Sequence, residues 1–290
     1  MLVSRRVFCR NSSSFLMNTS SANPLTPFIL LWRHRELLDQ FTRRTIQQRH
    51  RGSFLGVVWT VLTPLLSLGL YTFIFGYVFK SEFQAVPNPS RFDYPLGLFL
   101  GLVLFQFLGE LLAQSPLAIV TQPNFVKKVV FPLEILPAAV VGAAAFNAAV
   151  SFGLALLGIV LLGHGVDWHA LSVFLIFPPV LLIGLGCAWF LAGLGVFVRD
   201  TANVMPFLVQ VLIYTSAVFF SVNLVRHSAG WIILKFNPLL HAVEATRRTV
   251  LWHLPASAHS LIFLWVVGLV TCYLGYAFFS KTRHAFADVL

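Results

Sequence analysis

The sequence predicts an all-α integral membrane protein. Composition, the length of the apolar runs and the placement of basic residues lead to that class. Hydrophobic residues make up 58% of the 290 residues, charged residues only 10%, and the mean hydropathy is +0.82. Soluble domains carry about 25% charged residues. Several uncharged runs reach the roughly 20 residues that a helix needs to cross a bilayer. We therefore expect one polytopic membrane domain.

The first region, residues 1–26, is rich in Ser, Asn and Arg and contains no acidic residue. It has some transit-peptide character but lacks the apolar core of a secretory signal. We expect a disordered tail, or a start that extends beyond a true initiator at Met17.

Residues 27–50 are expected to form an amphipathic helix with Pro27 in its first turn. Such a basic helix ahead of a membrane span lies in the plane of the interface. It could serve only as a lipid anchor or also as a docking surface for a cytoplasmic partner, and the pattern leaves both open. Its apolar face holds Leu30, Leu31, Leu37, Leu38 and Phe41, and its polar face holds Arg33, Glu36, Asp39, Gln40, Arg43 and Gln47.

The membrane domain, residues 51–290, begins where this basic arm meets an uncharged run from Gly52 to Phe79. Arginines at the start of a span mark that end as cytoplasmic. With both termini inside, 14 of the 20 Lys and Arg lie in cytoplasmic segments. We expect Pro64 to kink the first span and Pro178-Pro179 to break or bend the fourth. The six predicted spans are residues 57–79, 95–115, 133–162, 170–198, 203–225 and 259–280.

Residues 226–258 are apolar enough to enter a membrane yet carry several charges. The Trp231–Leu234 run is short, Asn237-Pro238 favours a turn, and a second helix is expected from Leu239 to Trp252. Neither half can span a bilayer, so we expect a re-entrant helical hairpin entering from the outer face. It would act as a gate beside a conduit, or as a helix pair that covers the outer rim.

The sequence offers little catalytic chemistry. No phosphate-binding G-x-x-x-x-G-K-[ST] motif, metal-ligand cluster or nucleophile elbow occurs, and the three cysteines are scattered. The net charge of +10 is concentrated in the cytoplasmic segments, which favours anionic lipid and protein partners over nucleic acid. Glu110 interrupts the second span. It could line a polar conduit or cap the cytoplasmic end of that span near Gln114, and we favour the cap.

Aromatic residues are dense in the first span. Tyr71, Phe75 and Phe79 share one helical face, whereas Phe73 and Tyr77 share another. Aromatic faces stack on sugar rings, so Tyr71 and Phe75 are the candidates for lining a glycan path. The alternative is an interfacial or lipid-facing position, which is common for aromatic residues in membrane helices.

Residues 49–64 match the pattern R-x-R-G-S-x-L-G-x-x-W-x-x-x-x-P through Arg51, Gly52, Ser53, Gly56, Trp59 and Pro64. Further motifs are N-F-V-K-K-V-V-F-P-L-E-I-L-P at 124–137, V-R-D-T at 198–201 and N-P-L at 237–239. Together they resemble the ABC-2 type permeases that export polysaccharide, such as O-antigen, capsule or teichoic acid. One departure is Ser216-Ala217-Val218, where the family usually has Ser-Pro-Val, and it concerns the bend near the end of the fifth span.

The resemblance implies a homodimeric pore in the bacterial cytoplasmic membrane. It also implies a separate subunit that binds ATP and Mg²⁺, so that this chain needs no cofactor, and a lipid-linked polysaccharide as cargo. It places short gate helices on the outer side, for which the candidate residues are Asn237, Pro238, Glu244 and Arg247. The candidate residues for contact with the ATPase are Arg33, Glu36, Arg43, Arg44, Gln47, Asn124, Lys127, Lys128, Arg199 and Asp200.

Two other functions stay open from the sequence. An ABC-2 exporter of a small hydrophobic drug or lipid would share the same architecture. An integral-membrane transferase would need clustered polar catalytic residues near one membrane face, and only residues 241–248 approach such a cluster.

Overall fold

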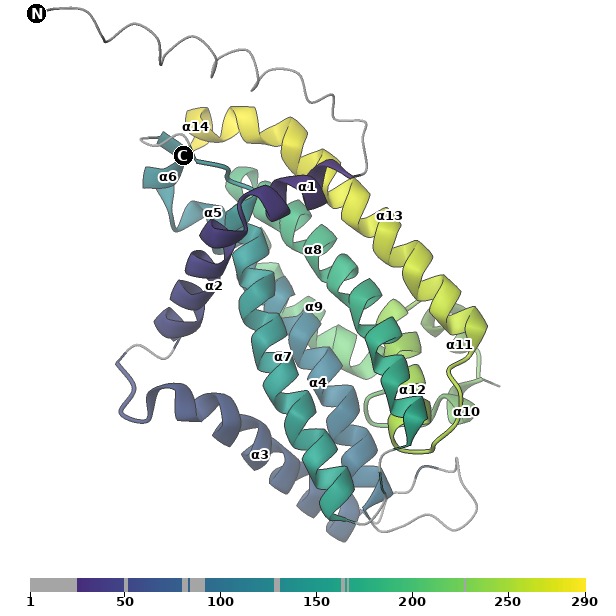
Figure 1. Cartoon of the computed structure of the whole chain (residues 1–290). Coiled ribbons are helices and arrows are strands. Elements are labelled where there is room, and N and C mark those ends of the chain that lie inside the picture. The colour runs from purple at the N-terminus through teal and green to yellow at the C-terminus, as the bar shows by residue number, and fades with distance from the viewer. Residues whose placement is uncertain are drawn as a thin grey trace, which may run out of the picture.

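The computed structural model contains helices and no strand in the part of the chain that it describes (Figure 1). The predictions made for the N-terminal tail through residue 24, and for Arg51 and Lys128, lie outside that part. The described residues are 25–49, 52–79, 83, 92–127, 131–162, 165, 167–226 and 228–290.

Four helices are long and apolar enough to cross a membrane, and they run alongside one another in Figure 1. They are α4 (Asp93–Gln114), α7 (Ile135–Leu161), α8 (Val173–Phe197), which follows the short 3₁₀ helix η3 (Trp168–Ser172), and α13 (Ala258–Thr282). Of these, α4 is the most buried and lies at the centre of the bundle. The helical class and the membrane character predicted from composition are therefore confirmed.

Helices α8 and α13 approach each other at small residues. A Cβ atom added to Gly275 would lie 2.0 Å from the carbonyl oxygen of Gly186, and one added to Gly186 would lie 2.2 Å from that of Thr271. Only glycine lets two backbones come this close, as in other tightly packed membrane helices. These contacts fix the position of α13 against the rest of the bundle.

The predicted interface helix is present as two pieces, α1 (Thr26–Arg33) and α2 (Arg35–Arg49). The break is at His34, whose φ of −107° and ψ of 27° leave the helical region. Helix α2 packs on α7, where Thr42 faces Gly142 so closely that an added Cβ would lie 2.7 Å from the threonine hydroxyl. The α2 helix is therefore attached to the bundle itself.

The first predicted span begins with a turn at Gly52 and Gly56, whose φ angles of +85° and +51° suit glycine. The chain then forms the 3₁₀ helix η1 (Gly56–Val58), α3 (Trp59–Tyr71) with Pro64 inside it, and the π-helix η2 (Thr72–Val78). The α-helical part alone is shorter than a bilayer crossing.

The fifth predicted span, residues 203–225, is wrong at its C-terminal end. Helix α9 (Thr201–Thr215) stops ten residues early, followed by a turn and the short α10 (Val222–Val225). The Ser216 hydroxyl donates to the Leu212 carbonyl at 2.5 Å, and Ala217 takes a left-handed φ of +54°, which ends the helix. The segment is uncharged throughout, so the length of the uncharged run could not locate this end.

Of the two outcomes predicted for Pro178-Pro179, a break or a bend, the break is wrong, because α8 continues through both prolines. Proline lacks the N–H for one backbone hydrogen bond, but membrane helices tolerate it where neighbouring groups satisfy the freed carbonyl.

The predicted hairpin residues form α11 (Trp231–Leu234) and α12 (Pro238–Val250), with the turn at Asn237. The Asn237 side chain accepts a hydrogen bond from the Leu239 N–H at 2.9 Å and so caps α12. Helix α12 is buried against α4, α8, α13 and η3. The short helices α10, α11 and α12 lie toward one end of the bundle.

The opposite end carries α1, α2 and the remaining short helices, and we call it the α2 end (Figure 1). These helices are α5 (Leu117–Val120), α6 (Pro123–Lys127), the 3₁₀ helix η4 (Arg283–Ala285) and α14 (Phe286–Val289).

The bend at Ala217 generates a first prediction. A proline ring holds φ near −65° and cannot adopt the observed +54°, whereas glycine adopts it without steric cost. Ala217→Pro should therefore destabilise the protein by about 3 kcal/mol, and Ala217→Gly should change stability by less than about 1 kcal/mol. Thermal unfolding of both variants in the same detergent measures the difference. A proline variant as stable as the parent would show that this bend does not depend on the left-handed residue.

Candidate functional site

The α2 end carries a continuous surface built from two segments that are distant in sequence. Phe41 of α2 lies against Phe125 of α6 and against Phe131, with ring centroids 5.4 and 5.1 Å apart. Phe125 and Phe131 are themselves 5.0 Å apart. This aromatic cluster joins the interface helix to the loop between α4 and α7, as expected if both contact one partner.

The predicted coupling residues on this surface are exposed wherever the structure describes them. Arg43 pairs with Asp39 at 2.9 Å, and the Arg44 guanidinium lies 5.8 Å from the centre of the Phe41 ring. The turn of Arg199 and Asp200 follows α8, whose Gly195 packs on the backbone of Pro116, next to α5. The exposed set is Arg33, Glu36, Arg43, Arg44, Gln47, Asn124, Lys127, Arg199 and Asp200.

At the same end, an ion pair with the buried Glu134 connects α7 to other long helices. Glu134, 1% exposed, pairs with Arg283, which follows α13, and the carbonyl of Glu134 accepts from the Trp189 indole at 3.1 Å. These contacts anchor the start of α7 to α8 and to the end of α13. The sequence interpretation did not single out Glu134 or Arg283, although a glutamate in an otherwise apolar stretch of the 124–137 motif was a usable signal.

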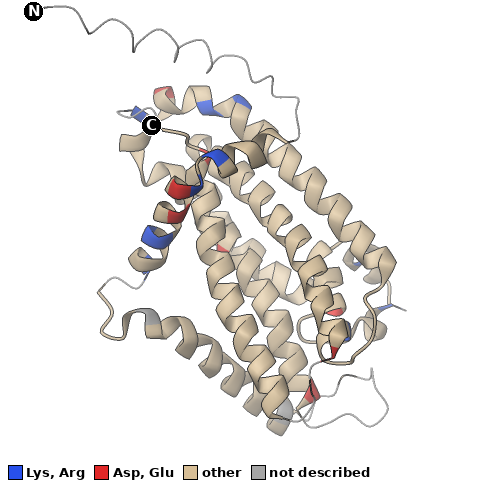
Figure 2. Ribbon diagram, viewed as in Figure 1, with Lys and Arg blue, Asp and Glu red and all other residues tan. Residues whose placement is uncertain are grey.

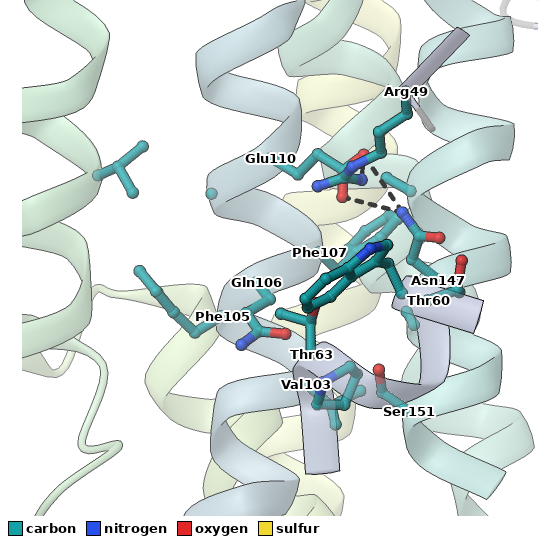
Figure 3. A pocket seen from close by; sticks show the side chains of 16 residues that line it. Arg49, Thr60, Thr63, Val103, Phe105, Gln106, Phe107, Glu110, Asn147 and Ser151 are labelled. Carbon is teal, nitrogen blue, oxygen red and sulfur yellow. Dashed lines mark hydrogen bonds and ion pairs between the residues drawn. The ribbon is translucent and has the colours of Figure 1, made fainter. Parts of the chain in front are cut away.

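A cavity of about 390 Å³ lies between α3, α4, α7 and α9 (Figure 3). Its wall combines aromatic rings with amide, hydroxyl and charged groups. Two residues of the motif at the start of the first span, Trp59 and Pro64, belong to this wall. The lining residues are Arg49, Trp59, Thr60, Thr63, Pro64, Val103, Phe105, Gln106, Phe107, Gly109, Glu110, Ala144, Asn147, Ala148, Ser151 and Val209.

Glu110 is the polar centre of this cavity. Its carboxylate forms an ion pair with Arg49, the last residue of α2, and accepts from the Asn147 amide of α7 at 3.3 and 3.5 Å (Figure 3). The Glu110 side chain is 12% exposed, and that of Arg49 is 43% exposed. The predicted capping role of Glu110 is wrong. Helix α4 ends at Gln114, with Ser115 as its C-cap, and the Glu110 carboxylate instead bonds residues of α2 and α7.

At the other end of the bundle, Arg247 of α12 is completely buried. Its guanidinium donates to the carbonyl of Gly97 at 2.7 Å and lies 4.4 Å from the centre of the Phe83 ring. It also donates to three carbonyls of the turn after α9, those of Ala217, Val218 and Phe220, at 2.7, 2.5 and 3.5 Å.

Asn237, a second residue of the predicted gate, also bonds the C-terminal end of α9. The Asn237 amide donates to the Thr215 carbonyl at 3.0 Å and to the hydroxyls of Thr215 and Ser216 at 3.2 Å each. Glu244 lines a separate cavity of about 390 Å³ together with Arg226 and Arg248. Asn237 and Arg247 thus connect the predicted hairpin to the end of α9 and the turn that follows it, and Arg247 also connects it to α4. Pro238 follows Asn237 as the first residue of α12.

The two aromatic faces predicted for the first span are confirmed. Tyr71 stacks on Phe75 with centroids 6.2 Å apart, and Phe73 stacks on Tyr77 at 5.9 Å. Phe75 also lies 5.5 Å from Phe219 and 6.0 Å from Tyr94. The first pair is half-buried in this cluster, and its role on a glycan path stays a prediction.

Most charged residues of the described part lie toward the two ends of the long helices, as the coloured ribbon of Figure 2 shows. Asp167 caps η3 through a hydrogen bond from the Trp168 N–H at 2.7 Å. Its carboxylate also bonds the His169 ring, and that bond lowers the pKa of Asp167 below its ordinary value, with the Trp168 bond as the next cause.

Comparison with known proteins identifies the family. The model of the family described as ABC-2 type transporter matches residues 36–251. The chain belongs to the ABC-2 type transporter family. The matched range begins in α2 and ends just after α12, so it contains most of α2, the cavity and the buried arginine.

Relatives of known role align along nearly the whole chain. An O-antigen export system permease protein RfbA of Myxococcus xanthus is 27% identical over 89% of this chain and 96% of its own length. A protein of the same name from Klebsiella pneumoniae is 22% identical over 88% and 95%. The polysialic acid transport protein KpsM of Escherichia coli is 25% identical over 83% and 92%.

Proposed function

We propose that this ABC-2 family member is the permease subunit of an ABC transporter that exports a lipid-linked polysaccharide across the bacterial cytoplasmic membrane. The observation that carries the proposal is the alignment with an O-antigen export permease over 89% of this chain and 96% of the relative. A polysialic acid transport protein aligns over a similar range. Two relatives that move different glycans favour a polymer as cargo over a small drug or a lipid.

The proposed topology has six spans with both termini in the cytoplasm. The four long helices supply spans two, three, four and six. Span one consists of η1, α3 and η2 together, and span five consists of α9. Helices α11 and α12 form the re-entrant hairpin on the outer side. The placement of α2, α6 and η4 at one end, with their basic residues, supports assigning that end to the cytoplasm.

The proposed assembly contains two copies of this chain and a separate nucleotide-binding subunit that holds ATP and Mg²⁺. Helices α3 and α9 flank the cavity and expose apolar side chains that a second copy would cover. Among them are Leu66 and Leu70 on α3 and Phe207, Leu208 and Tyr214 on α9. The exposed polar surface at the α2 end is the proposed contact for the ATPase.

Mass spectrometry of material bound to the purified complex tests the proposed cargo. The chain, co-expressed with its nucleotide-binding subunit in a strain that makes the glycan, should retain a lipid-linked sugar polymer. A strain unable to make the polymer is the control, and there the species should be missing. Recovery of a small hydrophobic compound or of phospholipid alone would favour the alternative exporter and overturn the proposal.

Charge reversal on α2 tests the proposed coupling surface. In Arg43→Glu/Arg44→Glu, like charges would face any acidic partner surface, and we expect export to fall at least about tenfold while membrane insertion is unchanged. Lys281→Glu, an exposed reversal at the same end but on α13, is the matched control and should export normally. Normal export by the double variant would remove α2 from the ATPase contact.

A cysteine accessibility measurement tests the proposed gate. Asn237 itself caps α12, so the adjacent Phe236, 66% exposed, is the better position for a cysteine in a cysteine-free background. Labelling by an impermeant thiol reagent should increase during ATP turnover, whereas a cysteine at Trp168 of η3, which is 71% exposed, should label equally in all states. Labelling at Phe236 that is complete without nucleotide would instead assign the hairpin to the outer rim.

A further inference from the structure

Two glycines lie in the described part of the segment between α2 and α3. Helix α2 ends at Arg49, and the chain then turns through Gly52 and Gly56, both with left-handed φ angles. A Cβ atom added to either glycine would have no neighbouring atom within 4 Å, so nothing packs against the two residues there. Because glycine changes its backbone angles at little steric cost, we expect a movement of α2 to alter these two residues rather than to pass along the chain into α3.

Side chains also connect α2 directly to the long helices, because α2 packs along α7 and its last residue reaches α4. Thr42 packs on Gly142 of α7, and Arg49 pairs with Glu110 of α4. The Glu110 contact is the stronger constraint on geometry, because a largely buried carboxylate loses much more by separation from its cation than an apolar contact loses by sliding. Asn147 of α7 holds the carboxylate in position from the other side.

Helix α4 continues this connection to the far end of the bundle. Glu110 and Gly97 are both on α4, about 20 Å apart along the helix axis. The Gly97 carbonyl accepts from the Arg247 Nε at 2.7 Å, and a Cβ added at Gly101 would lie 2.9 Å from Arg247 Nη2. One rigid helix therefore joins the ion pair at the end of α2 to the arginine that fixes α12.

We propose that the Arg49–Glu110 ion pair links α2 to α4, and that displacement of α2 reaches the hairpin of α11 and α12 through this helix and Arg247. Glu110 is then a positioning residue that makes no contact with ATP. The inference rests on the proposed function, since it takes the ATPase as the source of the displacement. Its distinct content is the route: the movement enters α4 through one side-chain pair rather than through the backbone into α3.

Glu110→Gln is the first test variant, because the neutral amide keeps the shape and leaves no unpaired charge on α4, while the half-exposed Arg49 can be hydrated. With the ATPase subunit bound, the nucleotide-dependent increase in labelling of a cysteine at Phe236 should fall at least about tenfold. Export per ATP hydrolysed should fall in parallel. Full nucleotide-dependent labelling in Glu110→Gln would overturn the inference.

Charge exchange provides the second test. Arg49→Glu and Glu110→Arg should each lose the nucleotide-dependent labelling, and the double variant should regain at least about a third of it, because the pair is restored in reverse. A double variant no better than the single ones, although folded, would argue against the link. Arg283→Gln breaks the ion pair with Glu134 at the same end and is the control. It should lower the thermal unfolding midpoint yet leave the labelling response of the folded protein intact.

The labelling measurement separates this inference from the proposed cargo. It needs only ATP turnover and the Phe236 cysteine, so it reports the route even if the exported molecule is not a polysaccharide. If the glycan is found but Glu110→Gln labels as the parent does, the proposed function stands and the route fails. If labelling depends on Glu110 while no glycan is bound, the route stands and the proposed cargo fails.

Discussion

The buried guanidinium of Arg247 is the interaction on which the arrangement of this permease most depends. Moving an ion of this size out of water costs several kcal/mol even after relaxation, so each donor must find an acceptor. Here the acceptors are carbonyls from α4 and from the turn after α9, and the Phe83 ring covers the guanidinium. To present its carbonyls inward, that turn adopts the left-handed conformation at Ala217, and α4 has glycine at 97 and 101 where the arginine approaches. The bend, the glycines and the position of α12 are thus consequences of one buried charge.

Local patterns predicted the features that depend on neighbouring residues. The turn at Asn237-Pro238 and the two aromatic faces follow from backbone preferences and helical periodicity, and both occur in the structure. The predicted end of α9 lies ten residues too late. Ser216 and Ala217 stop the helix, although the segment stays uncharged to Val225. Hydropathy measures the preference of a segment for the membrane, and it contains no information about where a hydrogen-bond pattern stops.

The polar contacts inside the bundle could not be predicted, because their partners are distant in sequence. Glu110 was visible as an ionisable residue in an apolar run, but nothing local assigns it to Arg49 or to Asn147. The same holds for Glu134 and Arg283, which are 149 residues apart in the sequence. Sequence reasoning could state that each buried charge needs a partner. Only the fold decides which partner, and for Glu110 that choice changed the interpretation from a helix cap to a contact between three helices.

The two charged centres differ in a way that suits different roles. Arg247 is fully buried and bonded to backbone carbonyls, so releasing it would expose several polar groups to an apolar environment at once, and the contact is effectively permanent. Arg49 is 43% exposed and bonded to a carboxylate, so water can hydrate its guanidinium when the pair separates. A fixed attachment at one end of α4 and a separable one at the other allow the helix to respond to α2 without loosening the hairpin that it carries. This difference in hydration, more than distance along the bundle, is the physical reason to place the moving contact at Glu110.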